Sequence, residues 1–152
     1  LIGMNARLDS IQAAVVGTKL EWYDETMKKR NECAEYYNEL LKENTYVKPP
    51  HLSTNCYSVW AQYSVLAPNK EARDFIVKNF KENGVNAAIF YPAPLHLQEC
   101  FKYLNYNVGD LPITEEICDR IFNLPCYGEF TREEQKKVVK ILNDSINILT
   151  SN

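Results

Sequence analysis

The side chains with the greatest chemical potential lie in two short segments of this 152-residue chain. Asn5 and Arg7 flank the start of the first predicted helix, where free backbone N–H groups favour anions. His96 follows a proline-stiffened stretch that begins at Tyr91, and histidine titrates close to neutral pH. Composition alone favours a plainer interpretation of both segments. On that view the first is a helix cap beside a solvated arginine, and the second holds a hydrogen-bonded loop histidine.

No complete catalytic or metal-binding motif accompanies these residues. The chain has five glycines, with neither a Walker loop nor a Gly-x-Gly-x-x-Gly turn. Its five cysteines are widely spaced without a Cys-x-x-Cys pair, and it has two histidines. A structural zinc site needs four closely placed ligands, so we expect no metal.

Composition also excludes several kinds of partner. The chain has 17 Lys plus Arg against 20 Asp plus Glu, a net charge of −3, which provides no field to attract nucleic acid or anionic lipid. No segment approaches the ~20 apolar residues that span a bilayer. An odd number of dispersed cysteines favours a reducing compartment. We therefore expect a cytoplasmic protein that binds neither nucleic acid nor membrane.

Hydrophobic periodicity predicts the elements that must position the candidate residues. Residues 8–41 form one long amphipathic helix or two in series, and Gly17 marks a close backbone approach or a nearby bend. Helices alternate with short extended segments, which are residues 46–48, 58–66, 85–90 and 122–124. We expect one α+β domain over residues 1–152, with a small antiparallel or mixed sheet of three to four strands covered by helices.

Capping residues mark where several helices start. Asn69 precedes a helix with an apolar stripe that ends at Gly84. Thr114 is placed to cap the next long helix, and Thr131 with Glu134 forms the pattern of a capping box. A short helix is expected between His96 and about residue 104.

Three stretches in order resemble the DegT/DnrJ/StrS family of sugar aminotransferases. The first is Gly-Met-Asn-Ala-Arg-Leu-Asp-Ser-Ile-Gln-Ala-Ala at residues 3–14, followed by Lys-Leu at 19–20 and Arg30. The second, Tyr-Pro-Ala-Pro-Leu-His-Leu-Gln at 91–98, is similar to the family's Tyr-Pro-x-Pro-Leu-His-x-Gln stretch. The third runs from Gly-Asp-Leu-Pro at 109–112 through residues 115–118 and Leu-Pro at 124–125 to residues 131–135. The resemblance covers essentially the whole chain.

This resemblance implies a fold-type I enzyme that depends on pyridoxal 5′-phosphate. Such an enzyme moves an amino group, usually from glutamate, to the keto carbon of a nucleotide-linked sugar. The cofactor needs a lysine and an acid at its pyridinium nitrogen, and in the family both lie in a larger N-terminal domain. Neither motif is present here, so the resemblance implies that residues 1–152 are the C-terminal small domain, inactive alone and part of a homodimer in the parent enzyme.

The resemblance also assigns roles to individual residues. Asn5 matches the asparagine that reaches across the dimer to the cofactor phosphate of the other subunit. Arg7 matches the arginine beside it, which we take to orient the active-site wall or an anionic substrate group. Tyr91 and His96 match the aromatic residue and histidine that face the sugar-nucleotide side of the cleft. No residue of this chain is expected to be catalytic.

Two alternatives remain at this stage. The ten tyrosines are more than a small core needs, which would suit a non-catalytic module that binds a partner through an aromatic-rich face. The second alternative keeps the fold and cofactor but changes the reaction, because some relatives dehydrate a keto-deoxysugar with histidine in place of the lysine. The nucleotide, the sugar and the carbon that is aminated do not follow from this sequence.

Overall fold

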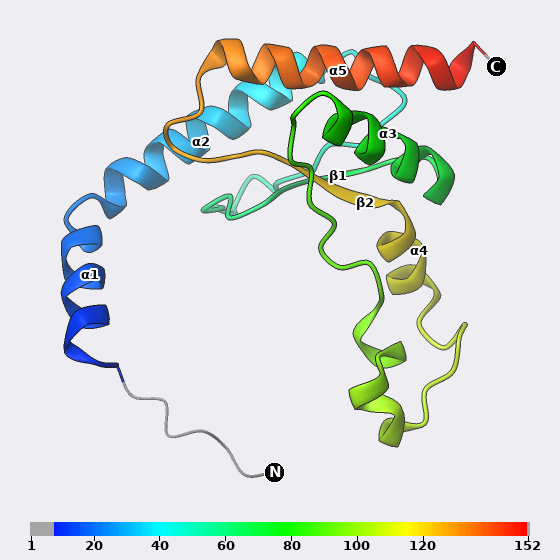
Figure 1. Ribbon diagram of the computed structural model, residues 1–152, viewed down its shortest axis with the longest axis horizontal. Helices are drawn as coiled ribbons and strands as arrows, with labels where there is room; N and C mark the ends of the chain where they lie inside the picture. Colours follow the sequence, from blue (N-terminus) through cyan, green and yellow to red (C-terminus); the bar gives the residue numbers. More distant parts are fainter. Residues whose placement is uncertain (1–7, 152) are drawn as a thin grey trace.

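The computed structural model describes residues 8–151 and shows a helix-rich α+β fold (Figure 1). The order of elements follows the chain. They are α1 (Ser10–Leu20), α2 (Tyr23–Leu40), β1 (Tyr63–Leu66), α3 (Lys70–Glu82), the 3-10 helices η1 (Leu95–Leu97) and η2 (Glu99–Leu104), α4 (Pro112–Arg120), β2 (Ile121–Leu124) and α5 (Arg132–Thr150). No helix among these described residues is long and apolar enough to cross a membrane.

The sheet consists of β1 and β2, which pair antiparallel with Tyr63 opposite Leu124. Two single bridges flank this pair, one from Lys48 to Leu66 and one from Ala88 to Asn123. The α+β class and a small antiparallel sheet are therefore confirmed, but two of the predicted strands contribute only one bridge each. The prolines at positions 49 and 50 explain one case, because proline cannot donate to a ladder.

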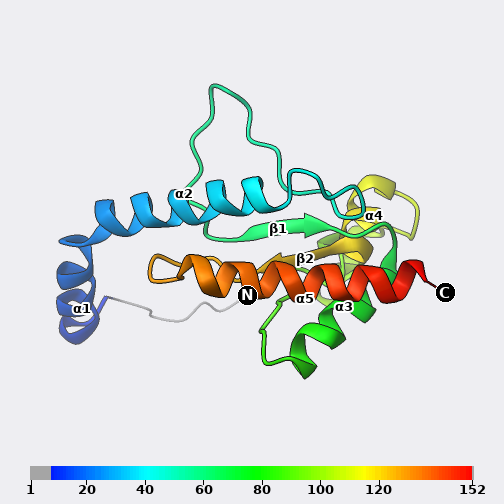
Figure 2. The ribbon, with the colours of Figure 1, turned by 90° about the horizontal axis from the view of Figure 1, so that it is seen from above.

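Helices α2, α3 and α5 pack together with the sheet to enclose the core (Figures 1 and 2). On β1 the side chains of Tyr63 and Val65 are fully buried, as strand alternation predicts, and Phe122 is buried on β2. Tyr37 of α2 packs its ring 4.9 Å from that of Tyr63. The side chains of Phe80 and Leu142 complete the centre of this core.

Both central tyrosines keep a hydrogen bond for the hydroxyl that they bury. Tyr37 donates to the Pro125 carbonyl over 3.0 Å, and Tyr63 donates to Asn38 Oδ1 over 2.7 Å. A buried hydroxyl without a partner costs about 1–3 kcal/mol, so these bonds make the tyrosines acceptable in a core. Part of the tyrosine excess thus has a structural reason.

The predicted caps are confirmed at α3 and α5 and wrong at α4. The side chain of Asn69 accepts from the Ala72 N–H over 2.8 Å. Thr131 and Glu134 form the reciprocal capping box of α5. At α4, by contrast, the helix begins at Pro112 rather than after Thr114, because proline fits the first helical position, where no N–H is needed.

The long N-terminal helix is divided into two helices in series. The chain leaves α1 at Glu21 and enters α2 after Trp22, so the bend lies four residues beyond Gly17. An added Cβ at Gly17 would meet nothing within 4 Å, so no neighbour approaches this glycine within the described structure. Helix α1 buries none of its residues and projects from the body of the domain, leaving Ile11 and Leu20 exposed (Figures 1 and 2).

Replacing Thr131 by alanine tests the capping box. We expect Thr131→Ala to lower the free energy of unfolding by about 1 kcal/mol, because one N–H at the start of α5 loses its acceptor. Urea denaturation measures the change. Thr150→Ala, at the exposed C-terminal end of the same helix, is the control and should change stability by less. Equal effects of the two substitutions would contradict a capping role.

Candidate functional site

The candidate site is an open pocket of about 560 Å³ between the segment that follows β-bridge residue Ala88 and helix α4. Both sequence-predicted residues of this region, Tyr91 and His96, line it. The wall is otherwise mainly hydrocarbon, supplied by Phe90, Leu95, Phe101, Leu104 and Leu111, with Thr114 and Cys118 contributing from α4. An apolar cavity with a few polar groups is typical of a small-ligand site.

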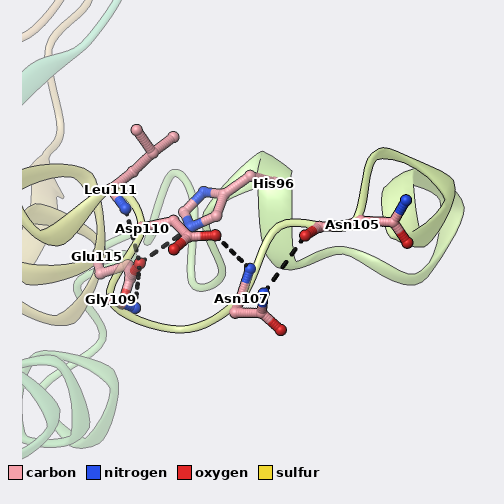
Figure 3. Close-up of polar contacts among 7 residues, drawn as sticks. All are labelled: His96, Asn105, Asn107, Gly109, Asp110, Leu111 and Glu115. Atoms are coloured by element: carbon pink, nitrogen blue, oxygen red, sulfur yellow. Dashed lines mark hydrogen bonds and ion pairs between the residues drawn. The ribbon is translucent and has the colours of Figure 1, made fainter.

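One carboxylate, that of Glu115, organises the polar side of this pocket (Figure 3). Its Oε1 lies 3.0 Å from His96 Nε2. The Gly109 N–H donates to both carboxylate oxygens, over 3.0 and 2.9 Å, and the Leu111 N–H donates to Oε1 over 3.3 Å. Glu115 therefore joins η1, the loop before α4 and α4 itself.

The loop before α4 is shaped to point its N–H groups at this carboxylate. Gly109 has φ +95°, a backbone conformation that glycine adopts without steric cost. The Asp110 carboxylate accepts from the Asn107 N–H over 2.7 Å, which closes the turn (Figure 3). Pro112 then starts α4 and places Glu115 in its first turn. The Gly-Asp-Leu-Pro stretch thus builds a backbone cradle for an anion that the chain itself supplies.

Hydrogen bonding keeps Glu115 in its ionised form. The Gly109 N–H lowers the pKa of this carboxyl most, partial burial opposes the shift, and the contacts with His96 and Leu111 lower the pKa further. Glu115 is thus an acceptor for every group around it at neutral pH.

The His96 ring is buried and contacts Tyr106 as well as Glu115. Its side chain is 5% exposed, and the edge of the ring meets Tyr106 with centroids 5.7 Å apart at 78°. Tyr91, in contrast, is 65% exposed at the rim of the pocket and contacts the ring of Phe90. The hydrogen-bonded histidine that residue types favoured is confirmed. The same histidine nevertheless lines the pocket.

Asn5 and Arg7 lie outside the described residues, so their roles stay predictions. Glu115 is the main residue that sequence reasoning did not single out as part of a site. The signal that could have found it is an acid in the first helical turn directly after a Gly-Asp-Leu-Pro turn.

The pocket offers hydrogen bonds and apolar contact but no lysine or acid for covalent cofactor chemistry. Lysine is absent from its lining, and Glu115 is occupied by the donors described above. Across residues 8–151 no group of three or more His, Cys, Asp or Glu side chains is arranged to hold a metal ion.

Solved structures of aminotransferases share this arrangement of elements. A DegT DnrJ EryC1 StrS aminotransferase from Brucella abortus is 37% identical, with a TM-score of 0.81 over 94% of this chain and 37% of that chain. NtdA from Bacillus subtilis, solved with bound cofactor PMP, is 27% identical, with a TM-score of 0.79 over 95% of this chain and 34% of that chain. The chain thus has the fold of about a third of each of these solved chains. Residues 1–143 match the DegT/DnrJ/EryC1/StrS aminotransferase family, and the chain belongs to that family.

Curated relatives also match over most of this chain. A dTDP-3-amino-3,6-dideoxy-alpha-D-galactopyranose transaminase from Aneurinibacillus thermoaerophilus is 32% identical over 93% of this chain. A protein from Geobacillus stearothermophilus named as a pleiotropic regulatory protein is 35% identical over 92% of this chain. The chain spans 37% of the length of each of these relatives.

Acidification tests the Glu115 contacts. Because the pKa of Glu115 is lower in the folded protein than its unfolded value of about 4.3, these contacts add stability above that value. The added stability is lost as the pH falls through the folded pKa. We expect Glu115→Gln to flatten this part of the curve of urea midpoint against pH. Glu116→Gln removes the neighbouring carboxylate that pairs with Arg120, and it should leave the pH dependence of the urea midpoint unchanged. If the curve of urea midpoint against pH were the same in Glu115→Gln as in wild type, the Glu115 contacts would not be the source of this stability.

Proposed function

We propose that this chain is the C-terminal domain of a pyridoxal 5′-phosphate-dependent aminotransferase that transfers an amino group, usually from glutamate, to a nucleotide-linked keto sugar. The family match over residues 1–143 carries the proposal. The transaminase named above, of which this chain spans 37%, acts on a dTDP-linked amino sugar by its name, which supports the substrate class. The pocket beside η1 supports it further, because it presents apolar walls and a held histidine on one surface.

In this proposal the cofactor is held mainly by parts of the enzyme outside this chain. When bound, pyridoxal 5′-phosphate accepts and returns the amino group as an electron sink. The pocket lining fits a supporting role, because it contains no lysine to bind the cofactor covalently. Asn5 would donate its amide N–H to the cofactor phosphate of the other subunit, and Arg7 would orient the neighbouring wall or an anionic group of the substrate.

Tyr91 and His96 would bind the sugar-nucleotide. An exposed aromatic ring at the pocket rim gives a flat surface for a sugar or base, and His96 gives one hydrogen-bonding position inside. The substrate would then be oriented by one contact at the rim of the pocket and one inside it.

A homodimer is part of the proposal, and exposed helix α1 supports it. Ile11 is 77% exposed and Leu20 is 63% exposed, and apolar side chains gathered on one helix are common at interfaces between subunits. The cytoplasm supplies both glutamate and nucleotide-sugars, and we propose it as the location.

Substitution of His96 in the full-length enzyme tests the substrate site. We expect His96→Ala to raise the KM for the nucleotide-sugar about tenfold, which corresponds to ~1.4 kcal/mol for one lost hydrogen bond. The half-reaction with glutamate should be unchanged, because the pocket is proposed to hold the sugar. His51→Ala, in an exposed loop, is the control. A dehydrated sugar product, or no glutamate-dependent turnover in wild type, would overturn the proposed reaction.

Substitution of Asn5 tests the proposed cofactor contact. We expect Asn5→Ala in the full-length enzyme to lower the fraction of subunits that retain the cofactor after gel filtration, because the phosphate loses a donor. Cofactor absorbance measures this occupancy. Asn55→Ala, an exposed loop asparagine, serves as the matched control. Equal occupancy in wild type and Asn5→Ala would remove this role.

A further inference from the structure

We propose that Glu115 is a positioning residue that fixes the tautomer of His96 with its hydrogen on Nε2, leaving Nδ1 as the acceptor that the pocket offers to a ligand. A ligand hydroxyl or N–H group would donate to that nitrogen. The identity of the ligand as a nucleotide-sugar rests on the function proposed above. The tautomer itself does not.

The hydrogen-bonding capacity of the Glu115 carboxylate determines which ring nitrogen of His96 carries the hydrogen. Glu115 accepts from two backbone N–H groups, those of Gly109 and Leu111, which can only donate. These bonds favour an ionised carboxylate, and an ionised carboxylate carries no hydrogen to give. The 3.0 Å contact with His96 Nε2 is therefore a hydrogen bond only if Nε2 carries the hydrogen.

Burial protects the hydrogen bond between His96 and Glu115 from replacement by water. The side chain of His96 is 5% exposed and that of Glu115 is 18% exposed, so water has little access to substitute for either partner. Tyr106 packs against the histidine ring edge to face and restricts its rotation. The ring orientation and the position of its hydrogen are thus set together.

The second ring nitrogen is left for a ligand. In a neutral imidazole with hydrogen on Nε2, Nδ1 is an acceptor. Within residues 8–151 the His96 ring forms its hydrogen bond with Glu115, through Nε2. Figure 3 shows the other ring nitrogen pointing away from that carboxylate. Because the surrounding wall is mainly hydrocarbon, a ligand that fills the pocket without a donor would leave this acceptor unpaired, which disfavours such ligands.

The same carboxylate also fixes the wall of the pocket. The loop that it holds through Gly109 and Leu111 contributes the Leu111 side chain to the lining. Loss of Glu115 would therefore release one hydrocarbon wall and the histidine together, because the hydrogen bonds of Glu115 link the loop to η1.

Nitrogen NMR of the 152-residue chain tests the tautomer directly. The sequence has two histidines, and His51 lies in an exposed loop, so it serves as an internal reference in ¹⁵N-histidine-labelled protein. In mildly alkaline solution, long-range ¹H–¹⁵N correlations should show His96 as one tautomer with hydrogen on Nε2, and His51 as a mixture. Hydrogen on Nδ1 of His96, or a mixture there, would overturn the proposal without any variant.

The Glu115→Gln substitution tests whether this carboxylate sets the tautomer of His96, because a glutamine amide can donate to Nε2 as well as accept from it. We expect the His96 ring to shift to a mixture of tautomers while the amide signals of α5, β1 and β2 stay in place. Glu116→Gln is the control and should match wild type. A His96 ring that keeps its single tautomer in folded Glu115→Gln would refute the positioning role.

Kinetics of the full-length enzyme separate this inference from the proposed function. Glu115→Gln should raise the KM for the nucleotide-sugar about tenfold, with the glutamate half-reaction unchanged. If the ring responds to the substitution while sugar kinetics do not, the tautomer inference stands and use of the pocket for the sugar is refuted. If wild type shows no transamination while the ring behaves as expected, the proposed function alone fails.

Discussion

The antiparallel pairing of β1 with β2 is the contact on which the rest of the structure depends. It joins residues 63–66 to residues 121–124 and carries the core on one side. Helix α4 runs into β2 without a loop, so the strand also fixes the end of the helix that bears Glu115. Arg120 reinforces this junction, because its Nε donates to the Ala67 carbonyl over 2.7 Å and its own carbonyl accepts from the Ala67 N–H over 3.0 Å.

A buried arginine of α3 also holds the junction between α4 and β2 in place. Arg73 of α3 is 3% exposed, donates through Nη1 to the carbonyls of Cys118 and Ile121, and meets the Asp74 carboxylate through Nε. These carbonyls belong to the end of α4 and the start of β2, where helical partners run out. The pocket wall formed by α4 is therefore anchored to the core at one end and shaped by the Glu115 cradle at the other.

Local signals in the sequence predicted the parts that depend on neighbouring residues. The caps at Asn69 and Thr131 and the alternation along β1 follow from residues a few positions apart, and the structure confirms them. The lengths of the strands were less predictable, because pairing depends on segments far apart in the chain. The site shows the same division: proline spacing marked His96, whereas its partner lies 19 residues away and is joined to it through the fold. Asn5 and Arg7 stay predictions.

The break between α1 and α2 has a geometric consequence. Helix α1 contains 11 residues, so it extends about 16 Å beyond Glu21 without buried side chains to brace it. A lever of that length converts a change of about 10° at the break into a displacement of about 3 Å at Ser10. The backbone conformation at Glu21 and Trp22 therefore sets the direction in which α1 projects from the domain.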